Sequence, residues 1–336
     1  MDVTRIMKMR GDGKMEETKL VGTEAVIRDG KFVFPDKTER YAIQRTKFEK
    51  DKPVIEIAEQ ENYEKIRFKM DGEMFQMLIE AAKILVPEFQ LKFRPDGMHV
   101  LFVDPQHVAM ERIFMPREAF SDYDLGDRYL TISLDIGRLK DLRIRKSTGV
   151  IAIGIGKLIC EEKKEKVVIN GLTHEFVSRE YGTSDVFITF GSMERRFSTL
   201  DNNSLTVPRV PAINTGNYVT VQTADMRAFL EQAARVSDTA KLILTEDGFV
   251  LESKSDTEEA RVKLERDRLK EIRLSDGSRI ASSYPVDYLA KFFSAIRKST
   301  EVRMSFSNDY PLQMEFLVRG MADTSVVCLL APRMEQ

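Results

Sequence analysis

The chain has 336 residues, 42% of them apolar and 32% charged, and is therefore long enough to bury the cores of two ordinary domains. The charges of its 54 acidic and 52 basic residues nearly cancel. This balance excludes a uniformly basic protein that coats nucleic acid and an acidic disordered chain. It contains no apolar run long enough for a membrane span and no signal-peptide core at its N-terminus, so we expect it to stay in the compartment where it is made.

Residues 1–64 predict a small β appendage. The stretch EAVIRDGKFVF (24–34) is typical of a hairpin with Asp29-Gly30 at the turn, and PVIEIA (53–58) is typical of a strand. This segment has no counterpart in the rest of the chain, and its residues indicate no role for it.

The rest of the chain contains an internal duplication. Residues 70–104 align with 221–256, and both stretches predict a helix, a strand, an Asp-Gly turn and a second strand. The tetrapeptide RKST also occurs twice, starting at 145 and at 297, and this interval nearly equals the one between the two Asp-Gly turns. Two unrelated signals at nearly one spacing predict that a half-chain is repeated.

Each copy predicts two helices packed on largely antiparallel strands, which is an α+β fold class. The helix over 223–236 has the apolar spacing of one buried face, with Thr223 as its N-cap. Its apolar residues are Met226, Phe229, Leu230, Ala233 and Ala234. The four helices are expected at 73–85, 134–146, 223–236 and 285–298, the last of which opens with proline at its first position.

A linker without sustained periodicity separates the copies. The stretch TLDNNSLTVPRVPAINTGNY (199–218) has two prolines and four asparagines. We therefore expect an N-terminal extension at 1–64, a first domain at 65–198, a connector at 199–217 and a second domain at 218–336.

Groups that could carry catalysis or hold a metal are scarce. The run at 149–157 has two glycines of a dinucleotide-binding loop but lacks the third glycine and a following helix. Cys160 and Cys328 have neither metal-site nor disulfide spacing, and we expect two buried thiols. The histidines, which show neither zinc spacing nor a paired base, are His99, His107 and His174. The residues thus predict no enzyme, no metal and no cofactor.

Basic residues are concentrated on the predicted helices. The helix at 134–146 has five bases against two acids, and the last helix has three bases against one acid. This pattern is typical of a solvated helix face, but helices that shared one surface would present these side chains to phosphates without reading bases. The candidate DNA-binding residues are Lys83, Arg138, Lys140, Arg143, Arg145, Lys146, Arg227, Arg235, Lys291, Arg297 and Lys298.

Two C-terminal stretches, SNDYPLQMEF (307–316) and CLLAPRMEQ (328–336), resemble the C-terminal signature of the proliferating cell nuclear antigen family, the sliding clamps of archaea and eukaryotes. Residues 96–142 are similar to the family's first domain in order and character. The resemblance is archaeal-like and covers residues 65–336. It implies the DNA-clamp fold, with two similar domains per chain, a closed ring of usually three subunits, helices that line a central hole and sheets that form the outer shell.

The resemblance implies a function as a DNA sliding clamp and polymerase processivity factor in replication and repair. Duplex DNA would thread a homotrimeric ring whose helices touch phosphates without sequence preference. The implied protein partners are DNA polymerase, the clamp loader, flap endonuclease and ligase, which bind through short apolar-aromatic motifs. No membrane partner is implied, and the implied location is the cytoplasm, at the nucleoid, in archaea and the nucleus in eukaryotes.

The resemblance also assigns residues to two further surfaces. A pocket for partner motifs is implied at Val103, His107, Met110, Val207, Pro208, Pro311, Leu329, Ala331 and Pro332. Subunit contacts are implied on two edge strands, at Val186, Ile188, Phe190, Ala260, Val262 and Leu264. Ordinary core or loop packing is the alternative for each of these residues.

The chain departs from the family pattern at several points. Residues 1–64 lie outside it, and 157–185 are longer than the family usually has beside the subunit edge. Ala228 and Glu231 stand where bases are common, and Leu329 replaces an aromatic residue of the pocket. Two alternatives therefore stay open. One is a specialised clamp subunit in a heteromeric, checkpoint-type or viral ring, and the other is a non-encircling module that sequesters clamp partners.

Overall fold

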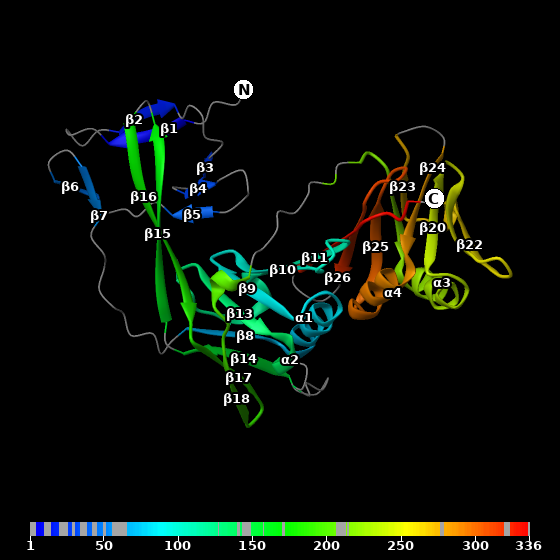
Figure 1. Cartoon of the computed structure of the whole chain (residues 1–336), viewed down its shortest axis with the longest axis horizontal. Coiled ribbons are helices and arrows are strands. Elements are labelled where there is room, and N and C mark those ends of the chain that lie inside the picture. The colour runs from blue at the N-terminus through cyan, green and yellow to red at the C-terminus, as the bar shows by residue number, and fades with distance from the viewer. Residues whose placement is uncertain are drawn as a thin grey trace.

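Figure 1 shows the computed structural model of the chain. It describes residues 66–336 except 127, 140–141, 143–148, 157, 170–171, 206–212, 214, 276–278, 319–322 and 335–336. Along 163–169 and 172–178, and in seven strands between residues 5 and 55, it describes the backbone alone.

The N-terminal strands form three small antiparallel sheets. One contains β1 (Arg5–Met9) and β2 (Met15–Lys19), the next contains β3 (Val26–Arg28), β4 (Lys31–Val33) and β5 (Glu39–Tyr41), and the last contains β6 (Thr46–Glu49) and β7 (Lys52–Ile55). The β3–β4 pair confirms the hairpin predicted at 24–34. The strand predicted at 53–58 is β7, which ends three residues earlier.

The first half of the remaining chain alternates strands with two helices. Its elements are β8 (Arg67–Asp71), α1 (Gly72–Leu85), β9 (Glu88–Arg94), β10 (Gly97–Val103), β11 (Ala109–Pro116), β12 (Phe120–Tyr123), β13 (Leu130–Asp135), α2 (Ile136–Leu139), β14 (Val150–Ile155), β15 (Leu158–Ile169), β16 (Leu172–Thr183), β17 (Asp185–Phe190) and β18 (Met193–Ser198). A short 3₁₀ turn, η3 (Asn202–Ser204), follows β18.

The second half repeats this order. Its elements are β19 (Tyr218–Gln222), α3 (Thr223–Val236), β20 (Thr239–Thr245), β21 (Gly248–Lys254), β22 (Glu259–Glu265), β23 (Glu271–Arg273), β24 (Arg279–Pro285), α4 (Val286–Ala295), β25 (Ser299–Ser305), β26 (Leu312–Val318) and β27 (Ser325–Leu330). The succession α1–β9–β10 recurs as α3–β20–β21, which confirms the predicted duplication. A Cβ on Gly97 would lie 2.2 Å from the carbonyl oxygen of Met115, so the first Asp-Gly turn requires glycine.

One eleven-stranded sheet runs through both halves. Its order is β15-β16-β13-β9-β10-β11-β27-β26-β25-β19-β23, and the halves meet where β11 pairs antiparallel with β27. A five-stranded sheet (β12-β8-β14-β17-β18) belongs to the first half, and a four-stranded sheet (β22-β21-β20-β24) belongs to the second. The halves are therefore joined by backbone hydrogen bonds in addition to the connector.

The four helices form a continuous row. Helix α1 contacts α2 on one side and α4 on the other, and α4 contacts α3. In Figure 1 the row extends from the centre of the view to its right side. In this row, α2-α1-α4-α3, the four helices lie next to one another. This is the arrangement in which their basic side chains could face phosphates together. None of the described helices combines the length and apolar character that a membrane crossing requires.

Local sequence explains how α1 and α3 begin and which faces they bury. Asp71 caps α1 by accepting hydrogen bonds from the backbone N–H groups of Glu73 at 2.8 Å and Met74 at 3.3 Å. In α3 the predicted apolar face is buried except for Ala234, which is exposed. The N-cap prediction for Thr223 was wrong, because Thr223 is the first helical residue and its hydroxyl donates instead to the Ser299 carbonyl at 2.6 Å.

The second helix of each copy is shorter at its start than predicted. Strand β13 continues to Asp135, which still pairs with Glu88, so α2 begins at Ile136. The rest of the helix predicted to 146 lies largely outside the described residues. Pro285 is the last residue of β24, so α4 begins at Val286, and it ends at Ala295. Arg297 and Lys298 therefore follow the helix rather than lie on it.

The prediction of two buried thiols is correct for only one cysteine. Cys328 lies on β27 inside the core and is 0% exposed. Cys160 is exposed on β15, which stands at the end of the large sheet and pairs with β16. An edge strand has a neighbour on one side only, so its side chains are less completely covered.

Candidate nucleic-acid interface and partner pocket

The cations of the helix row are mostly paired with acids. Lys83 lies 2.8 Å from Glu80, and Lys291 lies 3.3 Å from Asp287. Lys298 forms an ion pair with Glu73, which joins the segment after α4 to the start of α1. These side chains remain partly exposed, so a phosphate can compete for them, but the paired carboxylates reduce the attraction.

Two arginines of the predicted DNA-binding set are occupied by capping the C-terminus of α4. Arg227, on α3, donates from Nε to the Phe293 carbonyl at 3.0 Å and from Nη2 to the Ile296 carbonyl at 2.9 Å. Burial lowers the pKa of Arg227, and nearby Arg297 lowers it further. Arg297 itself donates to the Ser294 carbonyl at 2.9 Å. These bonds satisfy carbonyls that a helix end leaves unpaired.

Two further predicted DNA-binding residues lie on the helices at the two ends of the row. Arg235 is exposed in the last turn of α3. Arg138, on α2, is half-exposed, lies 3.7 Å from Asp135 and donates to the Ser198 carbonyl at 3.1 Å. The other four, Lys140, Arg143, Arg145 and Lys146, lie outside the described residues.

Three residues of the predicted partner pocket lie side by side, and we call them the pocket row. Val103 on β10 pairs with Met110 on β11, and Met110 pairs with Leu329 on β27. Because successive strand residues alternate between faces, this row lies on the face opposite the buried residues Phe102 and Cys328. Leu329 is 7% exposed, while Val103 and Met110 are half-buried.

The other described pocket residues surround this row. His107 is exposed in the loop between β10 and β11 and has a left-handed φ of 57°. Ala331 and Pro332 follow β27, and the Ala331 N–H donates to the Val108 carbonyl at 2.8 Å. Pro311 is half-buried just before β26. Val207 and Pro208 lie outside the described residues.

Residues 104–109, which we call the rim loop, are held in shape by one buried carboxylate. Asp104 is 2% exposed, and its Oδ1 accepts a hydrogen bond from the Ala109 N–H at 2.6 Å. Its Oδ2 accepts from the Gln106 N–H at 3.2 Å and from the Tyr288 hydroxyl at 3.1 Å. Sequence reasoning missed Asp104 and Tyr288, although an aspartate before a proline is a turn signal.

The prediction of an edge strand at 186–190 was wrong. Strand β17 lies between β14 and β18, and Val186 and Ile188 are each 1% exposed in the core. The outer strand of this sheet is β18, which the sequence analysis did not select. Strand β22, which carries Ala260, Val262 and Leu264, is the outer strand of its sheet, although Leu264 is buried.

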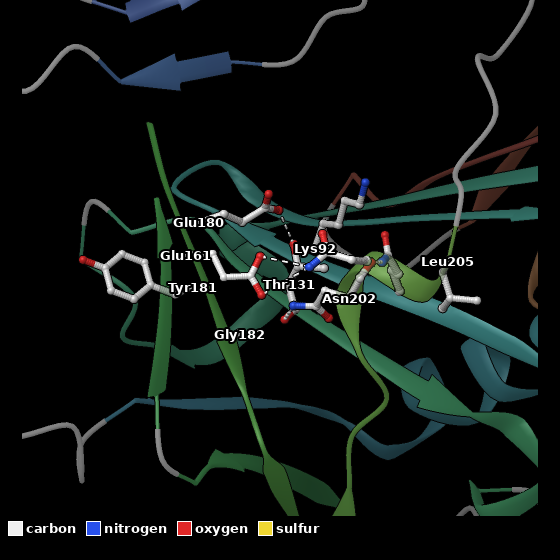
Figure 2. Close-up of a pocket in the computed structure, with 10 residues that line it drawn as sticks. Lys92, Thr131, Glu161, Glu180, Tyr181, Gly182, Asn202 and Leu205 are labelled. Atoms are coloured by element: carbon white, nitrogen blue, oxygen red, sulfur yellow. Dashed lines mark hydrogen bonds between the residues drawn. The ribbon is translucent and has the colours of Figure 1, made fainter. Parts of the chain in front are cut away.

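A polar pocket of about 240 Å³ lies where the β15–β16 hairpin meets the sheet (Figure 2). Glu180 on β16 accepts from the Thr131 hydroxyl at 2.7 Å and lies 3.2 Å from Arg94, whose side chain is 17% exposed. Burial lowers the pKa of Arg94, and the charge of Glu180 opposes this. Asn203 of η3 donates to Glu161 Oε2 on β15 at 3.3 Å. These polar contacts therefore hold the β15–β16 hairpin against the rest of the first half.

The described residues contain no cluster suited to a metal ion.

A chain whose two similar halves share one continuous sheet, backed by a row of four helices, has the architecture of a DNA-clamp subunit. A family model described as the proliferating cell nuclear antigen (PCNA) N-terminal domain matches residues 65–169. The DNA polymerase sliding clamp of Thermoplasma volcanium is 32% identical over 273 residues, which are 81% of this chain and 100% of the relative. That of Thermoplasma acidophilum is 31% identical with the same coverage. The chain belongs to the PCNA family of DNA polymerase sliding clamps.

Solved structures show the same fold. PCNA of A. fulgidus, bound to the C-terminal region of FEN-1, matches with a TM-score of 0.67 at 23% identity, covering 81% of this chain and 99% of that one. PCNA of Thermococcus kodakaraensis matches with a TM-score of 0.65 at 20% identity, covering 80% and 99%. The resemblance and the α+β clamp fold predicted from the sequence are confirmed, and the function as a DNA sliding clamp agrees with these relatives.

Proposed function

We propose that this clamp assembles into a closed homotrimeric ring around duplex DNA and tethers replication and repair enzymes without catalysing a reaction itself. The observation that carries the proposal is the helix row α2-α1-α4-α3, which brings helices of both halves together with Lys83, Lys291 and Lys298 on them or just after them. Contacts from such a surface to phosphates are independent of sequence and weaken with salt. Glu73, Glu80 and Asp287 each pair with one of these lysines and so weaken its attraction to phosphate. Weak phosphate contacts suit a ring that must slide along DNA.

Ring closure is proposed through the outer strands β18 and β22. Each ends its sheet in the described chain, so each has backbone groups free to pair with a strand of another subunit. The domain boundaries proposed from the sequence, at 198–199 and 217–218, place one such strand in each domain. Antiparallel addition of β18 to β22 would continue the sheets from subunit to subunit.

Partner binding is proposed at the pocket row. Val103, Met110 and Leu329 offer a mostly apolar strip, bordered by His107 and Ala331, for a short motif with aromatic anchors. The A. fulgidus clamp, a protein of the same fold, binds the C-terminal region of FEN-1. DNA polymerase, the clamp loader, flap endonuclease and ligase are the proposed partners here.

A heteromeric ring is the second candidate, because this chain carries a hairpin of two twelve-residue strands at one end of its large sheet. Light scattering across a dilution series separates the candidates. A mass of three chains supports the homotrimer, whereas a persistent monomer favours a ring that needs other subunits.

The DNA contact is tested by neutralising Arg138, Lys140, Arg143 and Lys298 together. DNA-dependent stimulation of a polymerase should be lost, because phosphates lose their cationic contacts in both halves. A matched control removes the same number of charges from strands outside the helix row, by neutralising Lys69, Lys254, Arg273 and Arg279 together. Unchanged stimulation in the first variant contradicts the proposal.

A further inference from the structure

One hydrogen bond links the helix row to the rim loop. The Tyr288 hydroxyl donates to Asp104 Oδ2 at 3.1 Å, although the two residues are 184 positions apart. Tyr288 lies on α4 in the second half of the chain, and Asp104 directly follows β10 in the first half. The contact therefore crosses between the halves on the side of the β11–β27 junction.

Asp104 depends on its donors because it is buried. An almost completely buried carboxylate is costly unless hydrogen bonds replace its lost water. Two of its three hydrogen bonds come from the rim loop itself, and the third comes from Tyr288. Backbone bonds close the same loop, from Asp104 N–H to the Ala109 carbonyl at 3.0 Å and from His107 N–H to the Asp104 carbonyl at 2.9 Å. Without Tyr288, Asp104 would keep only donors that move with the loop.

The rim loop in turn sets one side of the pocket row. Val108 accepts the hydrogen bond that holds Ala331, and Ala109 pairs with Leu330. The next pair along these strands is Met110 with Leu329, which belongs to the pocket row. A displacement of the rim loop would therefore change both the position of His107 and the path of the chain after β27.

Tyr288 is itself held from the helix row. The Lys291 ammonium lies 5.3 Å from the centroid of the Tyr288 ring, within the range of a cation–π contact. Burial raises the pKa of Tyr288, and the bond to Asp104 raises it further, so the hydroxyl stays a donor at neutral pH.

We propose that Tyr288 is a positioning residue for the partner pocket, acting through Asp104, so that the DNA-facing helix α4 shapes the partner-binding surface of its own subunit. The inference rests on the proposed role of the pocket row in partner binding. Tyr288 touches no partner itself in this proposal. Its hydroxyl fixes Asp104, which fixes the rim loop.

The test compares Tyr288→Phe with the wild-type clamp in two measurements. The first is amide hydrogen exchange at Gln106 and Ala109, which should become faster because their acceptor loses its anchor. The second is the affinity for a peptide of the C-terminal region of FEN-1 that binds the A. fulgidus clamp, which should weaken about tenfold, the size of one hydrogen bond to a charged group. Phenylalanine keeps the ring and its packing, so the melting temperature reports that the fold is intact. Tyr218→Phe, on β19, is the matched control.

A double-mutant comparison shows whether the effect passes through Asp104. In an Asp104→Ala background, Tyr288→Phe should cause no further loss of peptide affinity or amide protection. Additive losses, or wild-type exchange and affinity in Tyr288→Phe, would overturn the proposal. If the wild-type clamp does not bind the peptide, the pocket assignment fails, and the exchange measurement still decides whether Tyr288 positions the rim loop.

Discussion

Glu111 is the residue with the most unusual environment among those described. It lies on β11 at the junction of the halves, pairs in register with Phe102 and Cys328, and is 0% exposed. Neither of its carboxyl oxygens has a hydrogen-bond partner in the described part of the chain. Burial raises its pKa to about 8, so the side chain is largely protonated at neutral pH.

We predict that replacing Glu111 with methionine reduces the loss of stability that occurs as the pH rises toward about 8. The folded-state pKa lies above the unfolded value, so ionisation penalises folding increasingly as pH rises from the unfolded value toward about 8. In that window the wild-type protein should lose about 1.4 kcal/mol of unfolding free energy per pH unit relative to Glu111→Met. Denaturant unfolding at pH 5 and pH 8.5 measures this difference. Parallel pH dependences of the two proteins would contradict the assignment.

At the scale of elements, the β15–β16 hairpin is an addition to a complete scaffold. Its two ends lie next to each other, because Gly156 N–H donates to the Asp185 carbonyl at 2.9 Å and Ile155 pairs with Val186. Strands β14 and β17 thus pair without help from the hairpin. The hairpin contacts the rest of the first half through the pairing of Tyr181 with Leu130 on β13 and through Leu158, which is buried in the core. Its polar side-chain contacts concentrate on Glu161 and Glu180.

We predict that replacing residues 157–184 with Asn-Gly leaves a folded clamp. A two-residue turn suits the antiparallel pair that remains, and Arg94 loses its partner but regains water. The melting temperature should fall by only about 5 °C. The contrasting variant Glu180→Gln keeps Arg94 covered without its counter-charge, and it should cost about 1–2 kcal/mol. Calorimetry measures both variants, and an unfolded deletion variant would show that the hairpin belongs to the core fold.

At the scale of the whole molecule, one core and one sheet extend through both halves. The buried apolar cluster includes Phe102 and Ile113 from the first half together with Met314 and Cys328 from the second. Strands β11 and β27 pair in register from Ala109 to Phe114. Separating the two halves would therefore break this sheet at the β11–β27 pair.

We therefore predict that the two halves unfold in one cooperative transition. Opening the β11–β27 pair would expose apolar side chains of both halves together, which couples their stabilities. Circular dichroism and calorimetry should give coincident midpoints and a calorimetric enthalpy equal to the van't Hoff enthalpy. Two separated transitions would show that the halves are independent despite the shared sheet.

The amino-acid sequence alone determined the helices and turns whose formation depends on residues close together in the chain. The 3.6-residue spacing at 223–236 and the Asp-Gly turns at 96–97 and 247–248 are local signals, and the structure bears them out. The C-terminal stretches at 307–316 and 328–336 identified the family for the same reason. These signals arise from backbone conformation and side-chain periodicity, which short segments already specify.

Only the tertiary structure decided which groups meet across long separations. An alternating strand looks alike at the edge and in the interior, so β17 could not be distinguished from β18 until their partners were known. Burial of Glu111, exposure of Cys160 and the bond from Tyr288 to Asp104 likewise depend on chain segments far away in sequence. Pairing and burial are properties of the assembled sheets and core, which no single segment contains.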